Sequence, residues 1–267
     1  MVGLRSPDAA AGAVLDRLLA DAWPALVEER DATWRFRWTN GVTSRGSSAL
    51  AVGGNDHLDR LVARAEAFYA VRSSPARILV SDASAPPGLA GHLAARGYSS
   101  EKLTLVMVAA TADVRERMGI GGGGRGCRVT AAVDDEWFDA YWSVESARGR
   151  VDRDAAIYRE VLLAGDRPQR FVAATTATGD VVGTAQGVLD AGWCGVQCMT
   201  TRSTHLRRGV ASTVLAILAA EASAAGAHRM YLAVQADNAA AVSLYGRAGF
   251  RPAHRYRYMA GAVGTAG

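Results

Sequence analysis

Residues 199–212 constrain the fold more than any other stretch, because they read as the end of a strand, a basic turn and the start of a helix. Arg207 and Arg208 precede Gly209, and apolar residues then recur at helical spacing: Val210, Val214, Ile217 and Leu218. A glycine lets the backbone approach a ligand closely. The free N–H groups and the positive dipole end of a new helix suit a pyrophosphate. The stretch therefore predicts a strand-turn-helix unit with an anion site at the turn.

A second stretch, residues 238–250, follows a predicted strand at residues 230–234 and reads Asn-Ala-Ala-Ala-Val-Ser-Leu-Tyr-Gly-Arg-Ala-Gly-Phe. Together the two stretches resemble the GNAT superfamily of acyl-coenzyme A N-acyltransferases. The motif of that family has the form (Arg/Gln)xxGx(Gly/Ala), followed downstream by AsnxxAxxxTyr and GlyPhe. The chain departs from the motif at Leu206, where the family prefers Arg or Gln. Main-chain donors do not depend on side-chain type, and Arg207 and Arg208 keep positive charge at the site.

The resemblance implies a mixed fold of the α+β class (mixed α/β), with two GNAT-like domains, each a mixed, mostly antiparallel sheet flanked by helices. It implies acetyl-CoA as co-substrate, whose pantetheine arm enters a gap beside the strand predicted at residues 193–201. The parity of the strand ladder favours N–H or C=O groups of Met199 and Thr201 as partners of this arm. The residues assigned to the co-substrate are Met199, Thr201, Arg207, Arg208, Gly209, Val210, Ala211, Ser212 and Asn238. Asn238 is also a strong N-cap residue, so capping of the next helix is the alternative for its side chain.

Acyl transfer to an amine needs a positioned thioester, a stabilised oxyanion and a proton for the departing thiolate. The resemblance implies Tyr245 as the general acid: a phenol of pKa about 10 stays protonated at neutral pH, and the leaving thiol has a pKa of about 8.5. The alternative is that Tyr245 is a core aromatic residue beside Phe250. The backbone N–H of Met199 is the expected oxyanion donor. For the base, Glu145 is the acid that we name, and deprotonation through water is equally open.

The first half of the sequence repeats the order of the second. Residues 93–98, Leu-Ala-Ala-Arg-Gly-Tyr, align with residues 245–250, so Leu93 occupies the position of Tyr245. Asp56 and Asp59 occur where the second copy has its arginines, and their carboxylates would repel a pyrophosphate. We therefore expect a degenerate N-terminal domain at residues 1–118, a glycine-rich linker at 119–127 and a catalytic domain at 128–267. The first domain has either a structural role or a role in shaping the acceptor pocket.

Periodicity and turn signals indicate where the other elements lie. Helices are expected near residues 14–22, 58–69, 89–96, 134–144, 154–164, 210–218 and 239–244, and strands near 34–38, 78–80, 103–108, 171–176 and 181–189. Asn40-Gly41 is a strong hairpin signal, with a returning strand at residues 42–52. The resemblance makes residues 137–150 the candidate substrate-facing segment. Tyr141 and Trp142 recur at helical spacing, which is more typical of core residues.

Composition is that of a globular protein, with 49% hydrophobic and 21% charged residues. The net charge of +4 suits an anionic partner, but the arginines are spread along the chain, so we expect a nucleotide-bearing co-substrate and no nucleic acid. The three cysteines, Cys127, Cys194 and Cys198, form no CxxC pair, and we expect no metal site. No apolar run reaches transmembrane length. We expect a cytoplasmic protein, monomeric or homodimeric, without a membrane partner.

The leading hypothesis is an N-acetyltransferase that moves an acetyl group from acetyl-CoA to a primary amine of a small molecule or a protein, by direct transfer in a ternary complex. The alternative is a non-catalytic acyl-CoA-binding sensor or scaffold protein, which Leu206 and the missing base favour. A basic nucleic-acid binder is a third class, and it would require DNA binding that is sensitive to salt and unaffected by coenzyme A.

Overall fold

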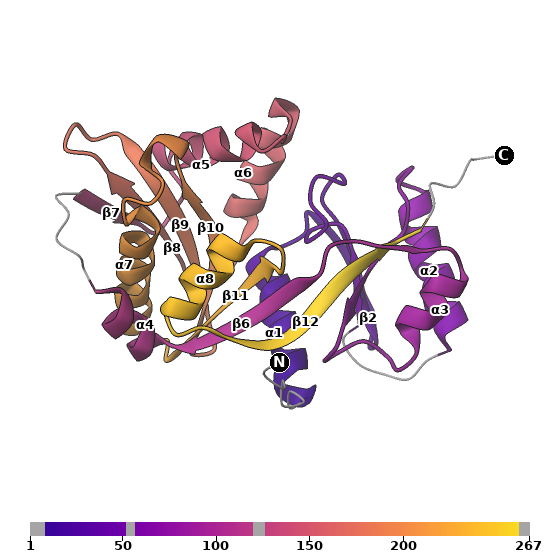
Figure 1. The fold of residues 1–267 in the computed structure, drawn as a ribbon. Helices are drawn as coiled ribbons and strands as arrows, with labels where there is room; N and C mark the ends of the chain where they lie inside the picture. Colours follow the sequence, from indigo (N-terminus) through magenta and orange to yellow (C-terminus); the bar gives the residue numbers. More distant parts are fainter. Residues whose placement is uncertain (1–8, 52–56, 120–125, 262–267) are drawn as a thin grey trace. The chain divides into compact units, whose positions relative to one another are not determined.

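The computed structural model describes residues 9–51, 57–119 and 126–261, and the chain divides into two compact units (Figure 1). The first unit consists of Met1–Val106, Gln235–Asp237 and Pro252–Gly267, and the second of Met107–Val234 and Asn238–Arg251. Each unit therefore takes chain from both halves of the sequence. Asn55, Asp56 and residues 120–125 of the expected linker lie outside the described residues. The repeat and its boundary at residues 119–127 stay predictions.

The first unit has its strands in the order β1-β2-β3-β4-β12. These strands are β1 (Val27–Arg30), β2 (Trp34–Trp38), β3 (Ala49–Ala51), β4 (Arg77–Ser81) and β12 (Arg251–Ala260). Pairing is antiparallel between β1 and β2, between β2 and β3, and between β4 and β12. Pairing is parallel between β3 and β4. A short strand, β5 (Ser99–Ser100), also pairs with β12. The helices of this unit are α1 (Ala9–Ala22), α2 (Leu58–Ala70) and α3 (Leu89–Ala95).

The predicted hairpin after β2 is only partly present. Asn40 and Gly41 have positive φ values of 48° and 70°, as the turn requires. Of the returning strand expected at residues 42–52, however, only Ala49–Ala51 pairs with β2, so that prediction was wrong in extent. The reason is a competing set of hydrogen bonds to the backbone: Ser47 Oγ accepts from the Thr39 N–H at 3.1 Å, and Thr43 Oγ1 accepts from the Gly46 N–H at 3.0 Å.

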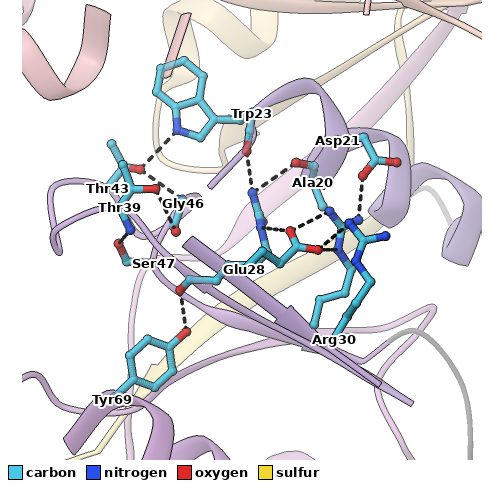
Figure 2. A network of polar contacts seen from close by, with 12 residues as sticks. Ala20, Asp21, Trp23, Glu28, Arg30, Thr39, Thr43, Gly46, Ser47 and Tyr69 are labelled. Atoms are coloured by element: carbon cyan, nitrogen blue, oxygen red, sulfur yellow. Dashed lines mark hydrogen bonds and ion pairs between the residues drawn. The ribbon is translucent and has the colours of Figure 1, made fainter. Parts of the chain in front are cut away.

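The strand β2 buries aromatic side chains on one face and arginine side chains on the other. Trp34 and Phe36 are fully buried in an apolar cluster with the predicted face of α2, which contributes Leu61, Val62, Ala65, Phe68 and Tyr69. Arg35 and Arg37 alternate with them and are also buried. Figure 2 shows the polar network around them, in which Glu28 of β1 accepts from Arg35 at 3.0 and 2.9 Å. These charge-assisted bonds satisfy the buried guanidinium of Arg35 and fasten β1 to β2.

The second unit contains the predicted strand-turn-helix segment. Its strands follow the order β6-β11-β10-β9-β8-β7, although residues 104–106 of β6 are counted with the first unit. The strands are β6 (Thr104–Ala110), β7 (Gly126–Thr130), β8 (Gln169–Thr175), β9 (Val181–Asp190), β10 (Trp193–Thr201) and β11 (Arg229–Gln235). Pairing is antiparallel from β7 to β10 and parallel between β10 and β11.

Helices cover both faces of the sheet in this unit (Figure 1). On one face, Trp137 of α5 (Asp135–Ala147) packs edge-on against Phe171 of β8, with ring centroids 5.1 Å apart, and α6 (Ala155–Ala164) follows α5. On the other face, α7 (Val210–Ala224) lies against Gly183 and Gly187 of β9 and packs with α4 (Thr111–Met118). The last helix, α8 (Ala239–Arg247), connects β11 to β12.

The predicted fold class is confirmed, since eight α-helices flank mixed, mostly antiparallel β-structure in the described residues. The strand predicted at residues 193–201 has these bounds, and Asp134 caps α5 by accepting from the Trp137 N–H at 2.9 Å. The elements β1 and α4 are among those that were not predicted, because both are rich in charged residues and lack a clear apolar pattern. Among the described residues, no helix is long and apolar enough to cross a membrane.

Candidate active site

The strands β10 and β11 pair only at the start of β10. Their parallel pairing joins Trp193, Cys194 and Gly195 to Arg229, Met230 and Tyr231, and it extends no further in the described chain. The rest of β10, residues 196–201, is paired with β9 alone. The far side of β10 is therefore an open strand edge, and such an edge can accept an extended chain as an added strand.

The open part of β10 also contains a bulge, formed by Cys198 and Met199. The register with β9 passes from Gln197 opposite Gln186 to Thr200 opposite Thr184, so these two residues lie opposite the single residue Ala185. Cys198 has a positive φ of 50°, which is uncommon for a residue other than glycine, asparagine or aspartate. A bulge re-aims the backbone groups on one side of a strand. The structure thus places the predicted oxyanion donor, Met199, at the irregular position of β10.

The turn from β10 to α7 presents backbone N–H groups to the surface. Both Arg207 and Gly209 have positive φ values, 58° and 79°, which turn the chain into the helix. Gly209 is the N-cap of α7 and provides no capping side chain. The N–H groups of Val210, Ala211 and Ser212 therefore begin the helix without a carbonyl partner in it. This is the geometry in which helix N-termini bind phosphate groups.

The charges around this turn favour an anion. Arg207, Arg208 and Gly209 are exposed, and the first turn of α7 contains no acidic residue. Among the ion pairs of the described residues, none involves Arg207 or Arg208. Leu206, the departure from the family motif, is 56% exposed and extended in backbone conformation, so its side chain occupies no position in the core. His205 lies in the same turn, where its Nδ1 contacts Thr204 Oγ1 at 2.9 Å.

Two glycines of β9 allow α7 to pack closely on the sheet. A Cβ atom at Gly183 would overlap Val210 Cγ1 and lie 3.3 Å from the Thr200 carbonyl oxygen. A Cβ atom at Gly187 would lie 2.5 Å from Leu218 Cδ1. The two positions are on the same face of β9, and both let the helix approach the strand closely. Sequence reasoning did not identify Gly183 as a site residue, although a glycine inside a predicted strand is a recognised signal of close backbone approach.

The second motif, residues 238–250, begins near the carboxyl ends of β10 and β11. Because β10 and β11 are parallel, their carboxyl ends lie together, and α7 and α8 begin just beyond them. Asn238 is the N-cap of α8, and its side-chain oxygen accepts from the Ala241 N–H at 3.1 Å. Capping, the alternative role considered for Asn238, is therefore present, and contact with the co-substrate stays a prediction.

Tyr245 lies on α8, and its side chain is largely buried. The residue is 8% exposed, and its ring packs edge-on against Phe250 at 5.8 Å between centroids. Its hydroxyl makes no hydrogen bond with the described residues. Burial raises the pKa of Tyr245 to about 12, against an opposing effect of the nearby Arg148 guanidinium. The phenol therefore stays protonated throughout the physiological pH range.

The predicted base, Glu145, lies near the end of α5 and is held by two arginines. Its carboxylate pairs with Arg148 at 3.0 Å and with Arg150 at 3.8 Å. The same Arg148 guanidinium opposes the effect of burial on the pKa of Tyr245. Of the aromatic residues on α5, Tyr141 is a core residue, whereas Trp142 is partly exposed and packs on Tyr158 of α6. A direct role of Glu145 in proton transfer stays a prediction.

No metal centre is found in the part of the chain that the structure describes, since no group of three or more His, Cys, Asp or Glu side chains is placed to hold an ion. The three cysteines are separate thiols. Burial raises the pKa of Cys194 to about 12, so this thiol is not ionised at neutral pH.

Comparison with known proteins identifies the family. A family model described as "Probable histone acetyltransferase Rv0428c C-terminal" matches residues 13–259. The chain belongs to this family. A curated relative, the uncharacterized N-acetyltransferase YobR of Bacillus subtilis (strain 168), is 28% identical over 253 residues, which cover 91% of this chain and 96% of YobR.

Solved structures of GNAT proteins share the fold. A GCN5-related N-acetyltransferase from Kribbella flavida superposes with a TM-score of 0.66 at 15% identity, covering 96% of this chain and 97% of its own. A tandem GNAT protein from the clavulanic acid biosynthesis pathway gives a TM-score of 0.65 at 12% identity, covering 95% and 89%. The predicted family is confirmed: this protein is a GNAT-family N-acetyltransferase, and thus an acyltransferase.

Membership in the GNAT family implies an acyl-CoA co-substrate, and the residues of this acetyltransferase fit one. The open edge of β10 suits the extended pantetheine arm, which carries amide groups. The uncapped first turn of α7, with exposed Arg207 and Arg208 beside it, suits the pyrophosphate. The two features adjoin in sequence and lie at one end of the sheet.

Proposed function

We propose that this acetyltransferase transfers an acetyl group from acetyl-CoA to a primary amine of a small molecule or a protein, by direct attack in a ternary complex. The observation that carries the proposal is the end of β10–β11 pairing at Gly195 and Tyr231, directly before the uncapped N-terminus of α7. The open strand edge suits the pantetheine arm of an acyl-CoA molecule, and the helix N-terminus that follows it in the chain suits the pyrophosphate.

The acyl group then lies beside β10, where the amine attacks the thioester carbonyl carbon. The carbonyl oxygen gains negative charge as the carbon becomes tetrahedral, and the Met199 N–H donates a hydrogen bond to it. The C–S bond breaks, the amide forms, and the sulfur leaves with the electron pair of that bond. Holding the two substrates together supplies much of the rate.

Tyr245 donates a hydrogen bond to the departing sulfur. Its pKa of about 12 keeps the phenol protonated, so it is a donor at any pH at which the protein works. Because a thiol has a pKa of only about 8.5, complete proton transfer from this phenol is uphill until the sulfur is desolvated beside it. The hydrogen bond to the sulfur therefore matters more than early transfer of the proton.

The acceptor is a primary amine that must lose a proton on attack. Glu145 is the carboxylate that we assign to this step, directly or through water, and both of its oxygens pair with arginines. The family description names a histone acetyltransferase, so a lysine-containing peptide is one acceptor class to test. Amines of small metabolites are the other.

The test is release of free thiol from acetyl-CoA by the full chain across a panel of small amines and lysine peptides, with direct measurement of acetyl-CoA binding by calorimetry. We expect binding, and thiol release with at least one amine class. The Tyr245→Phe variant should bind acetyl-CoA with an unchanged Kd and turn over about 100-fold more slowly. Binding without turnover on every amine would contradict the proposal and favour an acyl-CoA sensor. Unchanged turnover of the variant would remove Tyr245 as the acid.

A further inference from the structure

The bulge at Cys198 and Met199 is held by a set of buried side chains on the α5 face of the sheet. Thr184 of β9 is fully buried, and its Oγ1 donates to the Cys198 carbonyl oxygen at 3.0 Å. Thr184 Oγ1 also lies 2.6 Å from Thr200 Oγ1. Because Thr184 has one hydroxyl proton and gives it to Cys198, Thr200 must be the donor of the second bond. The two hydroxyls therefore form a chain in which Thr200 donates to Thr184 and Thr184 donates to the Cys198 carbonyl oxygen.

The side chain of Cys198 is held as well. Its Sγ donates to Gln186 Oε1 at 3.6 Å, and Gln186 Nε2 donates to Gln169 Oε1 at 2.6 Å. Gln169 Nε2 donates in turn to the carbonyl oxygens of Leu162 and Gly165, at the end of α6. Gln186 is 2% exposed and Gln169 is half-buried. A residue at positive φ is maintained only where its surroundings fix it, and here both its carbonyl and its side chain are fixed.

The hydroxyl of Thr184 determines where the next N–H points. A trans peptide is planar, so the C=O of Cys198 and the N–H of Met199 point in opposite directions. The carbonyl points to Thr184 on β9, and the N–H of Met199 therefore points away from β9. The neighbour of β10 on its other side is β11, and pairing with β11 has already ended at Gly195. The Met199 N–H thus faces the open edge.

We propose that Thr184 is a positioning residue for acyl transfer, which aims the Met199 N–H at the oxyanion by holding the Cys198 carbonyl. This inference rests on the proposed function and adds a residue that the family motif does not contain. Thr184 does not touch either substrate in this scheme. Its hydroxyl sets the orientation of one peptide plane, and Thr200, Gln186 and Gln169 hold that arrangement in place.

The test compares Thr184→Val, which removes the hydroxyl at nearly constant volume, with Thr184→Ser, which keeps it. Thr111→Val is the matched control, because Thr111 is 2% exposed in the same unit and its hydroxyl has no partner in the described structure. For Thr184→Val we expect kcat to fall about 10- to 100-fold, with the KM for acetyl-CoA within about threefold, because a misplaced oxyanion donor acts on the transition state. Thr184→Ser should restore kcat to within about threefold, and Thr111→Val should leave it unchanged.

A second readout needs no turnover. The chain has six methionines, so a protein labelled with 15N-methionine gives few amide signals, and Met199 is assigned by its loss in Met199→Leu. We expect the Met199 amide to shift in Thr184→Val but not in Thr111→Val. An unmoved Met199 amide, or an equal loss of kcat in both valine variants, would overturn the inference. A wild-type protein that binds no acetyl-CoA would instead refute the proposed function, while the amide spectra still decide whether Thr184 orients this peptide.

Discussion

Replacing Gly183 with alanine should weaken acyl-CoA binding by moving the N-terminus of α7. The added Cβ would overlap Val210 Cγ1, and it would lie 3.3 Å from the Thr200 carbonyl oxygen, which belongs to the backbone of β10 and cannot rotate away. Val210 is 1% exposed and is the first residue of α7, so its displacement moves the turn that bears the free N–H groups. Restoring ordinary carbon-carbon contact requires a shift on the order of 1 Å.

The size of the effect follows from the geometry of hydrogen bonds. A shift on the order of 1 Å takes an N–H···O distance of about 2.9 Å beyond the range of a good bond. Loss of one hydrogen bond to a charged group costs about 1.5–3 kcal/mol, which corresponds to an increase of about 10- to 100-fold in Kd. Overpacking itself should lower the free energy of unfolding by about 1–3 kcal/mol.

The matched control is Gly187→Ala, on the same strand and facing the same helix. Its Cβ would lie 2.5 Å from Leu218 Cδ1, in the middle of α7 and far from the helix start. We expect both variants to lose similar stability in urea titrations, but only Gly183→Ala to lose affinity in calorimetric titrations with acetyl-CoA. Gly183→Ala combined with Val210→Ala should regain affinity. Equal affinities of the two single variants would refute the reasoning that Gly183 seats the phosphate-binding turn.

Three further predictions concern α8 and the basic turn. Burial raises the pKa of Tyr245 from the unfolded value of about 10 to about 12, so its contribution to stability is complete below pH 10 and is lost as the pH rises toward 12. In urea titrations, wild type should therefore lose on the order of 1 kcal/mol of unfolding free energy relative to Tyr245→Phe between pH 9.5 and 11. A difference that stays constant over this pH range would show that the phenol is not buried. Asn238→Ala removes the cap at the Ala241 N–H and should lower stability by about 1 kcal/mol, whereas Asn238→Asp should not; both are measured by thermal unfolding. Arg207→Gln with Arg208→Gln should weaken acetyl-CoA binding several-fold at low salt and much less at 0.5 M salt, because exposed charges are screened; a loss independent of salt would contradict an electrostatic role.

The sequence predicted the second unit better than the first, for a physical reason. The strand at residues 193–201 and the helix after Gly209 are rich in apolar residues and flank a clear turn signal, and both were found. In the first unit, buried Arg35 and Arg37 replace apolar residues on one face of β2, and the partners that make this burial possible come from α1 and β1. Pairing between distant charges leaves no periodic signal, so β1 was missed.

For the candidate site, the sequence indicated the residues of the turn but not the shape of the strand before it. Gly209, Arg207 and Tyr245 were selected because their residue types are chemically distinctive, and their roles stay predictions. The bulge at Cys198 and Met199 depends on tertiary hydrogen bonds from Thr184 and Gln186, which are ordinary polar residues in an alternating strand. Backbone register between neighbouring strands cannot be obtained from one strand's sequence.

The strand β12 has a consequence for how the protein is made. All of β12 except Arg251 belongs to the first unit. It pairs with β4, some 175 positions earlier in the chain, as in the pairing of Tyr256 with Ser81. During synthesis on the ribosome, β4 emerges long before β12, so the edge of β4 that pairs with β12 stays unpaired in the meantime. An unpaired strand edge is prone to misassociation. The unit nearest the N-terminus is thus completed last, and a chain cut at residue 118 would retain that edge. Emergence of β12, rather than emergence of the first half of the chain, sets the earliest moment at which this unit can close.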